Sequence, residues 1–251
     1  MKQKNQRLAE IAAYIEETGY ASVPSLMTRF DKSKATIIRD LDMLAKSGEI
    51  ARVHGGAVAT NSSITKYELR KRINNDLKMK IAEEAAKLVE DHDDIFIDSG
   101  TTCFELFKRI HSQDVTVFTS NLEILTYDQQ KNIQHLYSIE GEVSQRSRSI
   151  GGSLAAENLK RINPNKVFFS SSGLSKDHMI ESDFEIVLAC LKSIANMNCC
   201  KIYLIDSSKI FTVRLFRAVP LMGIDYLITD SNISDKQASA LETVVKKLIV
   251  V

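Results

Sequence analysis

The sequence lacks the cysteine patterns that build disulfide frameworks or structural zinc sites. Its four cysteines, Cys103, Cys190, Cys199 and Cys200, show no CxxC spacing and have no histidine close by in the sequence. Both kinds of site need paired ligands at short spacings. We therefore expect no metal and no cofactor, and we interpret Cys190, which lies on the apolar stripe of an expected helix, as a small buried hydrophobic residue.

Long apolar runs are also missing. No run reaches the roughly 20 residues that a helix needs to cross a bilayer, and the segment MKQKNQRLAEIAAY has no continuous apolar core of a secretory signal. No repeat or low-complexity tract is visible. These absences predict a cytoplasmic protein with no membrane partner.

The chain carries little net charge, with 33 basic and 32 acidic side chains, but the charge is unevenly placed. Residues 1–80 hold 15 lysines and arginines against nine acidic residues, whereas residues 81–251 hold 18 against 23. A basic N-terminal part followed by an acidic remainder is typical of a DNA-binding domain joined to a separate sensor domain. The length of 251 residues suits one small and one medium domain.

Apolar spacing predicts three short helices near the N-terminus. The first carries Leu8, Ile11 and Ile15 and stops at Gly19, the second has Pro24 in its first turn, and Asp31-Lys32 forms a tight turn. The third runs from a capping Ser33 to Gly48, with Ile37, Leu41 and Leu44 on one apolar face. Two short helices joined by a tight turn form a helix-turn-helix.

The segment from Glu49 to Thr60 alternates around Gly55-Gly56, which is typical of a hairpin wing. In a winged helix the N-terminal end of the recognition helix enters the major groove, and the wing reaches the backbone or the minor groove. The alternative is a plain helical bundle with solvated charges. We predict that DNA contacts come from Lys32, Ser33, Lys34, Ala35, Thr36, Arg39, Arg52 and His54.

Residues 1–58 resemble the winged helix of the DeoR family of bacterial transcription regulators. The matching residues are Ser33, the run Thr36-Ile37-Ile38-Arg39-Asp40-Leu41, Gly48 and the run Arg52-Val53-His54-Gly55-Gly56-Ala57. Ile38 departs from this pattern, because the family usually has an arginine there. We expect either that a lysine compensates or that Ile38 touches a thymine methyl group, with an altered operator preference as the result.

Residues 59–77 are expected to form a linker, polar at first and then basic. It is either solvated, or its Arg70, Lys71 and Arg72 help to hold DNA or to dock the two domains. From Ile81 onward, helical patterns alternate with buried strand patterns at DDIFID, VTVFT, VFFSSS, KIYLID and DYLIT. This alternation predicts an α/β domain over residues 78–251, with a mostly parallel sheet covered on both faces.

Three of the expected strands end in small, hydroxyl-rich loops. In parallel sheets ligands bind beyond the C-terminal strand ends, where hydroxyl and backbone N–H groups can surround an anion. Taken singly, each loop is also what ordinary helix capping produces. We predict that the loops converge on a phosphorylated polyol through Asp98, Ser99, Gly100, Thr101, Thr102, Thr119, Ser120, Asn121, Asp206 and Lys209.

Residues of about 75 to 232 resemble the DeoR-family sensor domain, through DSGTT, TSN, DSSK and the later Ile228-Thr229-Asp230. The resemblance implies a fold similar to ribose-phosphate isomerases and a sugar-phosphate effector. Two alternatives stay open: a sugar-phosphate isomerase-like enzyme that uses Asp98, Asp206, Glu185 and Lys209, and a DNA binder whose sensor domain is empty. In the stretch RSRSIGG, Arg146 and Arg148 either meet a phosphate or lie in a solvated loop.

The resemblance and the residues together predict a DNA-binding regulator rather than an enzyme. Most relatives repress sugar-catabolic operons, so we expect a repressor of a sugar or polyol operon that a phosphorylated sugar releases from double-stranded operator DNA. We also expect a homo-oligomer, a dimer or a tetramer, because one small module alone rarely reaches operator-level affinity.

Overall fold

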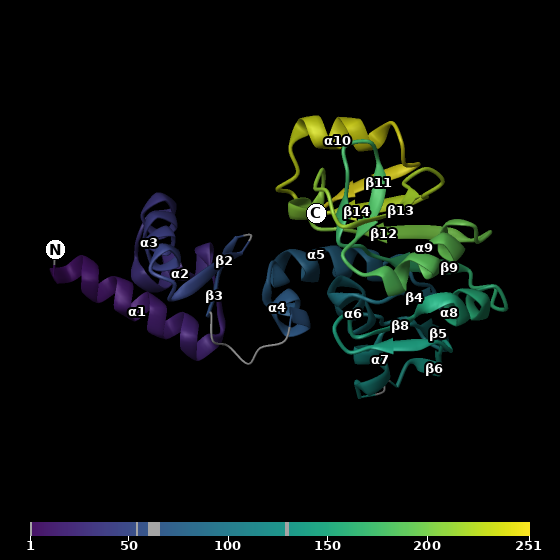
Figure 1. Cartoon of the computed structure of the whole chain (residues 1–251). Helices are drawn as coiled ribbons and strands as arrows, with labels where there is room; N and C mark the ends of the chain where they lie inside the picture. The colour runs from purple at the N-terminus through teal and green to yellow at the C-terminus, as the bar shows by residue number, and fades with distance from the viewer. Residues whose placement is uncertain (1, 54, 60–65, 129–130) are drawn as a thin grey trace. The chain divides into compact units, whose positions relative to one another are not determined.

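A computed structural model of the chain is shown in Figure 1. It describes residues 2–53, 55–59, 66–128 and 131–251. The chain divides into two compact units, Met1–Asn75 and Asp76–Val251. Within the described residues, no helix is both long and apolar enough to cross a membrane.

The first unit is a winged helix-turn-helix, as predicted. Its helices are α1 (Lys2–Thr18), α2 (Val23–Phe30), α3 (Lys34–Lys46) and α4 (Lys66–Arg72), and its strands are β1 (Tyr20–Ser22), β2 (Ile50–Val53) and β3 (Gly56–Ala59). Apolar side chains on the inner faces of the helices form one core, in which Ile11, Ile15, Leu26, Ile37 and Leu41 are fully buried. The hydrophobic spacing of these helices therefore corresponds to real packing.

Strand β1 was not predicted from the sequence. It has only three residues between two helices, yet it pairs antiparallel with β3, so that the sheet order is β1-β3-β2. The pairing brings the backbones so close that a Cβ atom on Gly56 would lie 2.2 Å from the carbonyl oxygen of Ala21. Only glycine fits at this position, which attaches the wing firmly to the helices.

The helix α4 occupies part of the basic segment before the second unit. Its Arg70 guanidinium lies 5.4 Å from the ring centre of Tyr67, which is a cation–π distance. Arg72 donates a hydrogen bond to the carbonyl oxygen of Thr18, at the end of α1. Both contacts lie within the first unit.

The second unit is built on a seven-stranded sheet in which every pairing is parallel. The strand order is β15-β14-β12-β9-β4-β5-β6. The sequence predicted five of these strands, which lie within one or a few residues of the expected positions. The strands are β4 (Asp94–Ile97), β5 (Val115–Thr119), β6 (Ile133–Ser138), β9 (Lys166–Phe169), β12 (Cys200–Leu204), β14 (Tyr226–Thr229) and β15 (Lys247–Val250).

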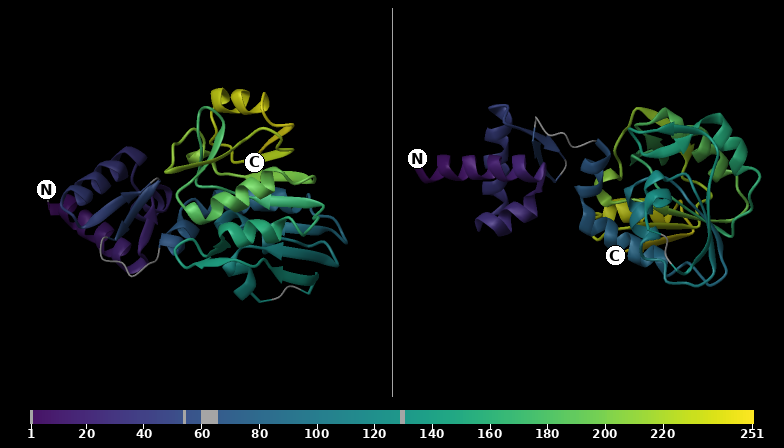
Figure 2. Two further views of the ribbon diagram at one scale, coloured as in Figure 1. Left: turned by 45° about the vertical axis from the view of Figure 1, so that its right-hand side comes forward. Right: turned by 90° about the horizontal axis from the view of Figure 1, so that it is seen from below.

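Helices cover both faces of this sheet, and alternate residues of each strand point to opposite faces. Ile95 and Ile97 of β4 pack with α5 (Asn75–Ala86), α6 (Thr101–Phe107) and α7 (Leu122–Thr126). Phe96 packs on the other side, together with α8 (Gly152–Leu159), α9 (Leu188–Ala195) and α10 (Asp235–Glu242). Figure 2 shows this layered arrangement from two further directions. As expected, Cys190 is buried in α9.

The helix expected around residues 81–90 begins earlier, at Asn75, and ends at Ala86. Its first turns carry Asp76, Lys78 and Lys80, which hid the helical period from the apolar pattern. Lys78 is nevertheless only 2% exposed.

Two small antiparallel sheets complete the second unit. One pairs β7 (Glu142–Ser144) with β8 (Ser149–Gly151), and the other has the order β10-β11-β13. The strands of the latter are β10 (Gly173–Leu174), β11 (Met179–Ser182) and β13 (Phe216–Pro220). Two short 3-10 helices are η1 (Glu185–Val187) and η2 (Ser207–Lys209).

The order of the large sheet places a reversal at its centre. In chain order, β5 and then β6 lie on one side of β4. The chain then returns to the other side of β4, where β9, β12, β14 and β15 follow one another toward the opposite edge. A reversal of this kind leaves a crevice beyond the carboxyl ends of the two central strands, and open α/β sheets bind ligands there. In this sheet the reversal falls between β4 and β9, so the loops that follow these two strands mark the candidate site.

Candidate functional site

The start of α3 is shaped by local hydrogen bonds. Asp31 adopts a left-handed conformation (φ 49°) that closes α2, and Ser33 is the N-cap of α3. The Ser33 hydroxyl accepts a hydrogen bond from the Thr36 N–H at 3.3 Å and lies 2.9 Å from the Thr36 hydroxyl. Ser33 therefore fixes where α3 begins, in addition to any contact that it makes with DNA.

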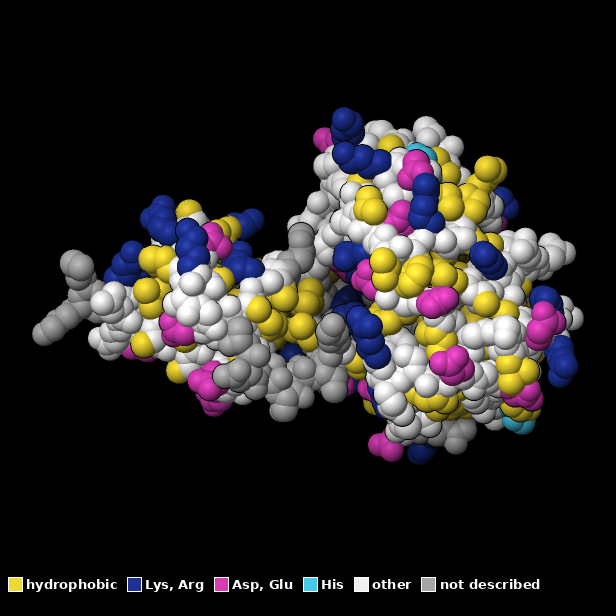
Figure 3. All heavy atoms as spheres, viewed as in Figure 1, with side chains coloured by type: hydrophobic (Ala, Val, Ile, Leu, Met, Phe, Trp, Pro, Cys, Tyr) yellow, Lys and Arg dark blue, Asp and Glu magenta, His cyan; other side chains and the backbone are white. Residues whose placement is uncertain are grey.

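Most of the side chains that we predicted for DNA contact are exposed at this end of α3. Lys32, Ser33, Lys34, Ala35 and Arg39 are exposed, and Thr36 is partly buried. In Figure 3, dark blue side chains gather over the part of the first unit where α3 lies. The helix thus presents basic and hydroxyl groups to solvent while its opposite face fills the core.

Of the two remaining predicted DNA-contact residues, Arg52 and His54, only Arg52 lies within the described part of the chain. Arg52 is exposed on β2, and its Nε atom lies 3.4 Å from a carboxylate oxygen of Asp42 on α3. This ion pair links the wing to the recognition helix. His54, the remaining prediction, lies outside the described residues.

A partly buried ion pair, which was not predicted from the sequence, attaches α3 to α1. Arg7 donates two hydrogen bonds to the carboxylate of Asp40, from Nε at 2.7 Å and from Nη2 at 3.1 Å. Asp40 is 1% exposed, and its hydrogen bond with Arg7 raises the pKa of the guanidinium. The two residues are 33 positions apart, so spacing alone gave no sign that they meet.

Ile38 packs partly against the core of the first unit. Its side chain is half-buried, between the fully buried Ile37 and the exposed Arg39. The departure from the family pattern therefore replaces an arginine by a side chain that contributes to packing.

In the second unit, the loops after β4 and β5 are joined by side-chain hydrogen bonds. The Ser120 hydroxyl donates to Asp98 at 2.8 Å, and the Asn121 amide donates to the carbonyl oxygen of Gly100 at 3.0 Å. The other side of the Asn121 amide accepts a hydrogen bond from the Glu123 N–H at 3.0 Å. Two of the three predicted loops thus form one hydrogen-bonded unit.

The third predicted loop brings a cation to the same edge of the sheet. The Lys209 ammonium lies 3.4 Å from a carboxylate oxygen of Asp206 and 3.3 Å from the carbonyl oxygen of Ser171. Lys209 thus reaches the loop after β9, and that loop in turn lies beside the loop after β4, because a Cβ atom on Gly100 would be 3.8 Å from the Cβ atom of Ser170.

Burial gives Asp98 an unusual acidity. Its carboxyl group is 3% exposed, and this burial raises its pKa to about 6. Hydrogen bonds from the Ser120 hydroxyl and the Ser99 N–H oppose the shift without cancelling it. The group is largely ionised at neutral pH and becomes protonated under mildly acidic conditions.

Most of the predicted effector residues are buried behind the surface of the site. Thr101 is 7% exposed, whereas Thr102, Thr119, Ser120, Asn121 and Asp206 are at or below 1%. Ser99, Gly100 and Lys209 are partly exposed. Only the latter group can meet a ligand without a rearrangement, so the buried set holds the loops in shape.

The Thr102 hydroxyl is buried and has no hydrogen-bond partner within the described part of the chain. A buried hydroxyl without a partner is costly in a folded protein. Thr102 stands one residue after Thr101, in the first turn of α6.

The loop after β9, which reads Ser170-Ser171-Ser172, was not predicted to be part of the site. It lies at the reversal of strand order, opposite the loop that follows β4, and a Cβ atom on Gly100 would be 3.8 Å from the Cβ atom of Ser170. The signal was present, because VFFSSS is another strand that ends in hydroxyl residues. What the sequence did not show is that β9 lies between β4 and β12.

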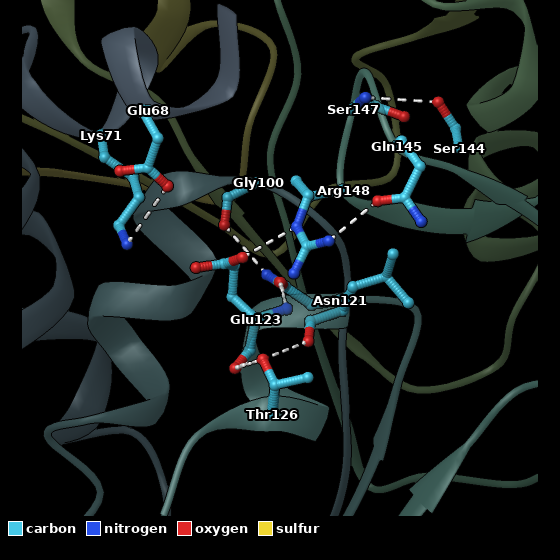
Figure 4. Close-up of polar contacts among 11 residues, drawn as sticks. Glu68, Lys71, Gly100, Asn121, Glu123, Thr126, Ser144, Gln145, Ser147 and Arg148 are labelled. Carbon is cyan, nitrogen blue, oxygen red and sulfur yellow. Dashed lines mark hydrogen bonds and ion pairs between the residues drawn. The ribbon is translucent and has the colours of Figure 1, made fainter. Parts of the chain in front are cut away.

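A further wall, which follows β7, packs against the loop after β5. Arg148 donates a hydrogen bond to Glu123 at 2.9 Å and another to Gln145 at 2.9 Å (Figure 4). The Ile150 N–H donates to the carbonyl oxygen of Ser120 at 2.8 Å. Arg148 thus holds this wall against α7, a role that was not considered from the sequence. Arg146 lies over the Phe184 ring, 5.6 Å from its centre.

The chain matches two family models, and together they span both units. The DeoR-like helix-turn-helix domain matches residues 7–63, and the DeoR C terminal sensor domain matches residues 73–231. The chain belongs to the DeoR family. It is accordingly a DNA-binding transcriptional regulator and not an enzyme, and its second unit is a DeoR sensor domain.

Relatives of similar length support this assignment. The chain is 31% identical to the lactose phosphotransferase system repressor of Streptococcus mutans, with 93% of this chain and 94% of the relative covered. It is 29% identical to the HTH-type transcriptional regulator IolR of Bacillus subtilis, with the same coverage. It is also 31% identical to the HTH-type transcriptional regulator GolR of Listeria innocua, with 91% of each chain covered.

Among solved structures, the chain is similar to ribose 5-phosphate isomerase A from Methanocaldococcus jannaschii. The identity is 19%, 55% of each chain is covered and the TM-score is 0.39. So distant a likeness carries no argument about the site.

Proposed function

We propose that this DeoR-family regulator represses a sugar or polyol catabolic operon and leaves its operator when a phosphorylated sugar binds beyond the C-terminal ends of β4, β5, β9 and β12. The lactose phosphotransferase system repressor among its relatives supports the sugar class of operon. The observation that carries the proposal is the convergence of hydroxyl-rich loops and one lysine at the reversal of strand order.

The chemistry of this edge of the sheet suits such an effector. Lys209 supplies a positive charge for the phosphate, and the exposed part of Ser99 and Gly100 supplies hydroxyl and N–H donors. Gly100 has φ 115°, a conformation that L side chains rarely adopt, so its backbone can approach a ligand closely. Asp98, buried behind the loop, accepts a hydrogen bond from the Ser120 hydroxyl and so holds the loops that carry these donors in place.

DNA recognition is assigned to the exposed face of α3. Lys32, Lys34 and Arg39 meet phosphates or base edges, with Ser33, Ala35 and Thr36 at the helix start. Arg52 and His54 contact the DNA backbone or the minor groove from the wing. Two or four copies place their α3 helices on spaced half-sites, because a single module of this size binds weakly.

The test uses the full chain and labelled DNA from its own upstream promoter at one fixed salt concentration, since salt alone changes affinity strongly. The DNA is titrated with protein in the presence of a panel of sugar phosphates and of their unphosphorylated parents. We expect one phosphorylated sugar to weaken DNA binding by about 5- to 150-fold, the usual range of allosteric coupling, while its parent sugar has no effect.

Substitutions locate the response. Lys209→Ala should abolish the response to the sugar phosphate and leave DNA affinity in its absence unchanged. Lys160→Ala is the matched control, because Lys160 is an exposed lysine directly after α8 that pairs with Glu157. Tight DNA binding that ignores every sugar phosphate would overturn the proposed switch and favour a DNA binder with an empty sensor domain.

A further inference from the structure

Arg214 differs from the other arginines near it in the second unit. Arg109, Arg148 and Arg217 each donate a side-chain hydrogen bond to a carboxylate. The Nε atom of Arg214 is buried without a partner among the described residues, and its Nη1 atom lies 3.8 Å from a carboxylate oxygen of Asp183, beyond hydrogen-bond distance. A guanidinium carries five N–H donors. Arg214 can therefore bind a further acceptor without breaking an existing hydrogen bond of its side chain.

The Arg214 side chain lies against the backbone of Gly173, the first residue of β10. Gly173 directly follows the loop Ser170-Ser171-Ser172 of the candidate site. A Cβ atom on Gly173 would lie 2.8 Å from Cγ and 3.1 Å from Nε of Arg214. The arginine thus fits here only because residue 173 has no side chain. It is 33% exposed, so part of its guanidinium reaches the surface beside the loop.

Lys209 approaches the same loop from the same segment of the chain, residues 209–214. Its ammonium lies 3.3 Å from the carbonyl oxygen of Ser171, two residues before Gly173. Two residues of chain span at most about 7 Å. Lys209 and Arg214 therefore place two cations along one short stretch of the loop after β9.

Hydrogen bonds hold the segment that carries both cations. The Thr212 hydroxyl donates to the carbonyl oxygen of Lys209 at 2.7 Å, and the Thr212 N–H donates to Leu174 of β10 at 3.0 Å. The Arg214 N–H donates to the carboxylate of Glu181 on β11. Groups that are already fixed lose little conformational freedom when a ligand binds, so the two cations are prepared for binding.

The acidic side chains close to Arg214 leave its guanidinium available. The Glu181 carboxylate accepts the backbone N–H of Arg214, and its other oxygen lies 3.9 Å from Nε of Arg217, which offsets its charge. Asp183 is 45% exposed, and a loose ion pair at such a site contributes little. An anionic ligand can therefore replace Asp183 beside Arg214 at small cost.

We propose that Arg214 binds a second anionic group of the effector, separate from the phosphate that Lys209 binds. The effector is then a phosphorylated sugar that carries another oxyanion, a carboxylate or a second phosphate, and not a sugar monophosphate. Both groups match the planar guanidinium, which can donate two parallel hydrogen bonds to them. The inference rests on the proposed function, because it takes the phosphate to bind at Lys209.

Release of the full chain from its own promoter DNA tests this assignment. The ligands are phosphorylated sugar acids and sugar bisphosphates, each beside its monophosphate, among them gluconate 6-phosphate beside glucose 6-phosphate and fructose 1,6-bisphosphate beside fructose 6-phosphate. We expect a doubly anionic compound to release the DNA at a concentration at least about 10-fold below that of its monophosphate, the size of one charge-assisted contact.

Three variants locate this preference. Arg214→Gln should reduce it to less than about 3-fold. Gly173→Ala should do the same while it keeps the arginine, because the added Cβ displaces the Arg214 side chain. Arg161→Gln, at an exposed arginine just after α8, is the matched control and should keep the preference of the wild type. Thermal unfolding of each variant without ligand shows whether it is folded.

The outcomes separate this inference from the proposed function. A wild type that responds equally to monophosphates and to their doubly anionic counterparts overturns the inference and leaves the sugar-phosphate switch intact, and so does a preference that survives in folded Arg214→Gln. A wild type that ignores every phosphorylated compound overturns both. A response to unphosphorylated sugar acids alone, lost in Arg214→Gln, would refute the proposed phosphate recognition and support Arg214 as an anion-binding residue.

Discussion

The recognition helix and the strand-end site use polar side chains in opposite ways. On α3 the predicted contact residues Lys32, Lys34 and Arg39 are exposed, whereas Ser120, Asn121 and Asp206 of the second unit are almost fully buried. A duplex supplies partners for the first set, while the second set uses the protein itself. The polar residues at the start of α3 are therefore available for direct binding, whereas those of the strand-end loops chiefly hold the site in shape.

The largest effect that this comparison predicts is at Asn121. Asn121→Ala removes both hydrogen bonds of a fully buried amide, to Gly100 and from the Glu123 N–H, and leaves a small cavity. We expect a loss of roughly 3 to 4 kcal/mol in the free energy of unfolding of the second unit, measured by denaturant titration. A variant that unfolds like the wild type and loses only effector binding would contradict the comparison.

A gain of stability is expected from Asp98→Asn. The folded-state pKa of about 6 lies above the ordinary value of 3.8, so the folded protein binds more protons than the unfolded chain between these values. Burial of the ionised group is therefore unfavourable above pH 6, by roughly 2 to 3 kcal/mol. We expect Asp98→Asn to stabilise the protein by up to about that amount at pH 8.

The difference in unfolding free energy between Asp98→Asn and the wild type should depend on pH. It should shrink as pH falls through 6 and level off below pH 3.8, where both the folded and the unfolded wild type become protonated. Denaturant titrations of the two proteins at several pH values measure it. A difference that is constant with pH would show that the carboxyl group does not titrate in this range.

For Arg39 we expect the opposite of Asn121, namely a small effect on stability and a large effect on DNA binding. Arg39→Ala removes an exposed guanidinium from α3, so the unfolding free energy should change by less than about 0.5 kcal/mol. DNA binding should weaken by about 5- to 150-fold, or roughly 1 to 3 kcal/mol, if the side chain reaches a base edge. Fluorescence anisotropy with operator DNA measures the loss, and unchanged affinity would remove Arg39 from the reading surface.

The smallest effect is expected at Lys34. If it contacts a phosphate, Lys34→Ala should weaken binding to all DNA sequences equally and lower the slope of log affinity against log salt by about 1. Glu157→Ala in the second unit is the control and should leave the slope unchanged. A sequence-dependent loss would instead make Lys34 a base contact.

Much of the fold was predictable from the sequence because its signals are local. The apolar stripe of Ile37, Leu41 and Leu44 and the cap at Ser33 indicated α3, and short buried runs indicated five central strands. The three-residue strand β1 was missed because its stability comes from pairing with β3, which is far away in the sequence. The same holds for the ion pair between Arg7 and Asp40.

The candidate site was predictable only loop by loop. The hydroxyl-rich strand ends were visible, and the structure brings the three predicted loops together. The loop Ser170-Ser171-Ser172 was overlooked because its importance depends on strand order, which no short pattern encodes. Whether a serine or threonine is exposed is also a tertiary property: Ser99 and Ser120 follow neighbouring strands, yet one is partly exposed and the other 1% exposed.

The reversal of strand order has a consequence for synthesis on the ribosome. Strands β4, β5 and β6 are complete by residue 138, but β9, which pairs with β4, ends only at Phe169. Until then one edge of β4 has no partner in the nascent chain, and an unpaired edge of this kind invites aggregation. Because Lys209 emerges later still, a chain that stops before it can fold its DNA reader yet never acquire the full strand-end site.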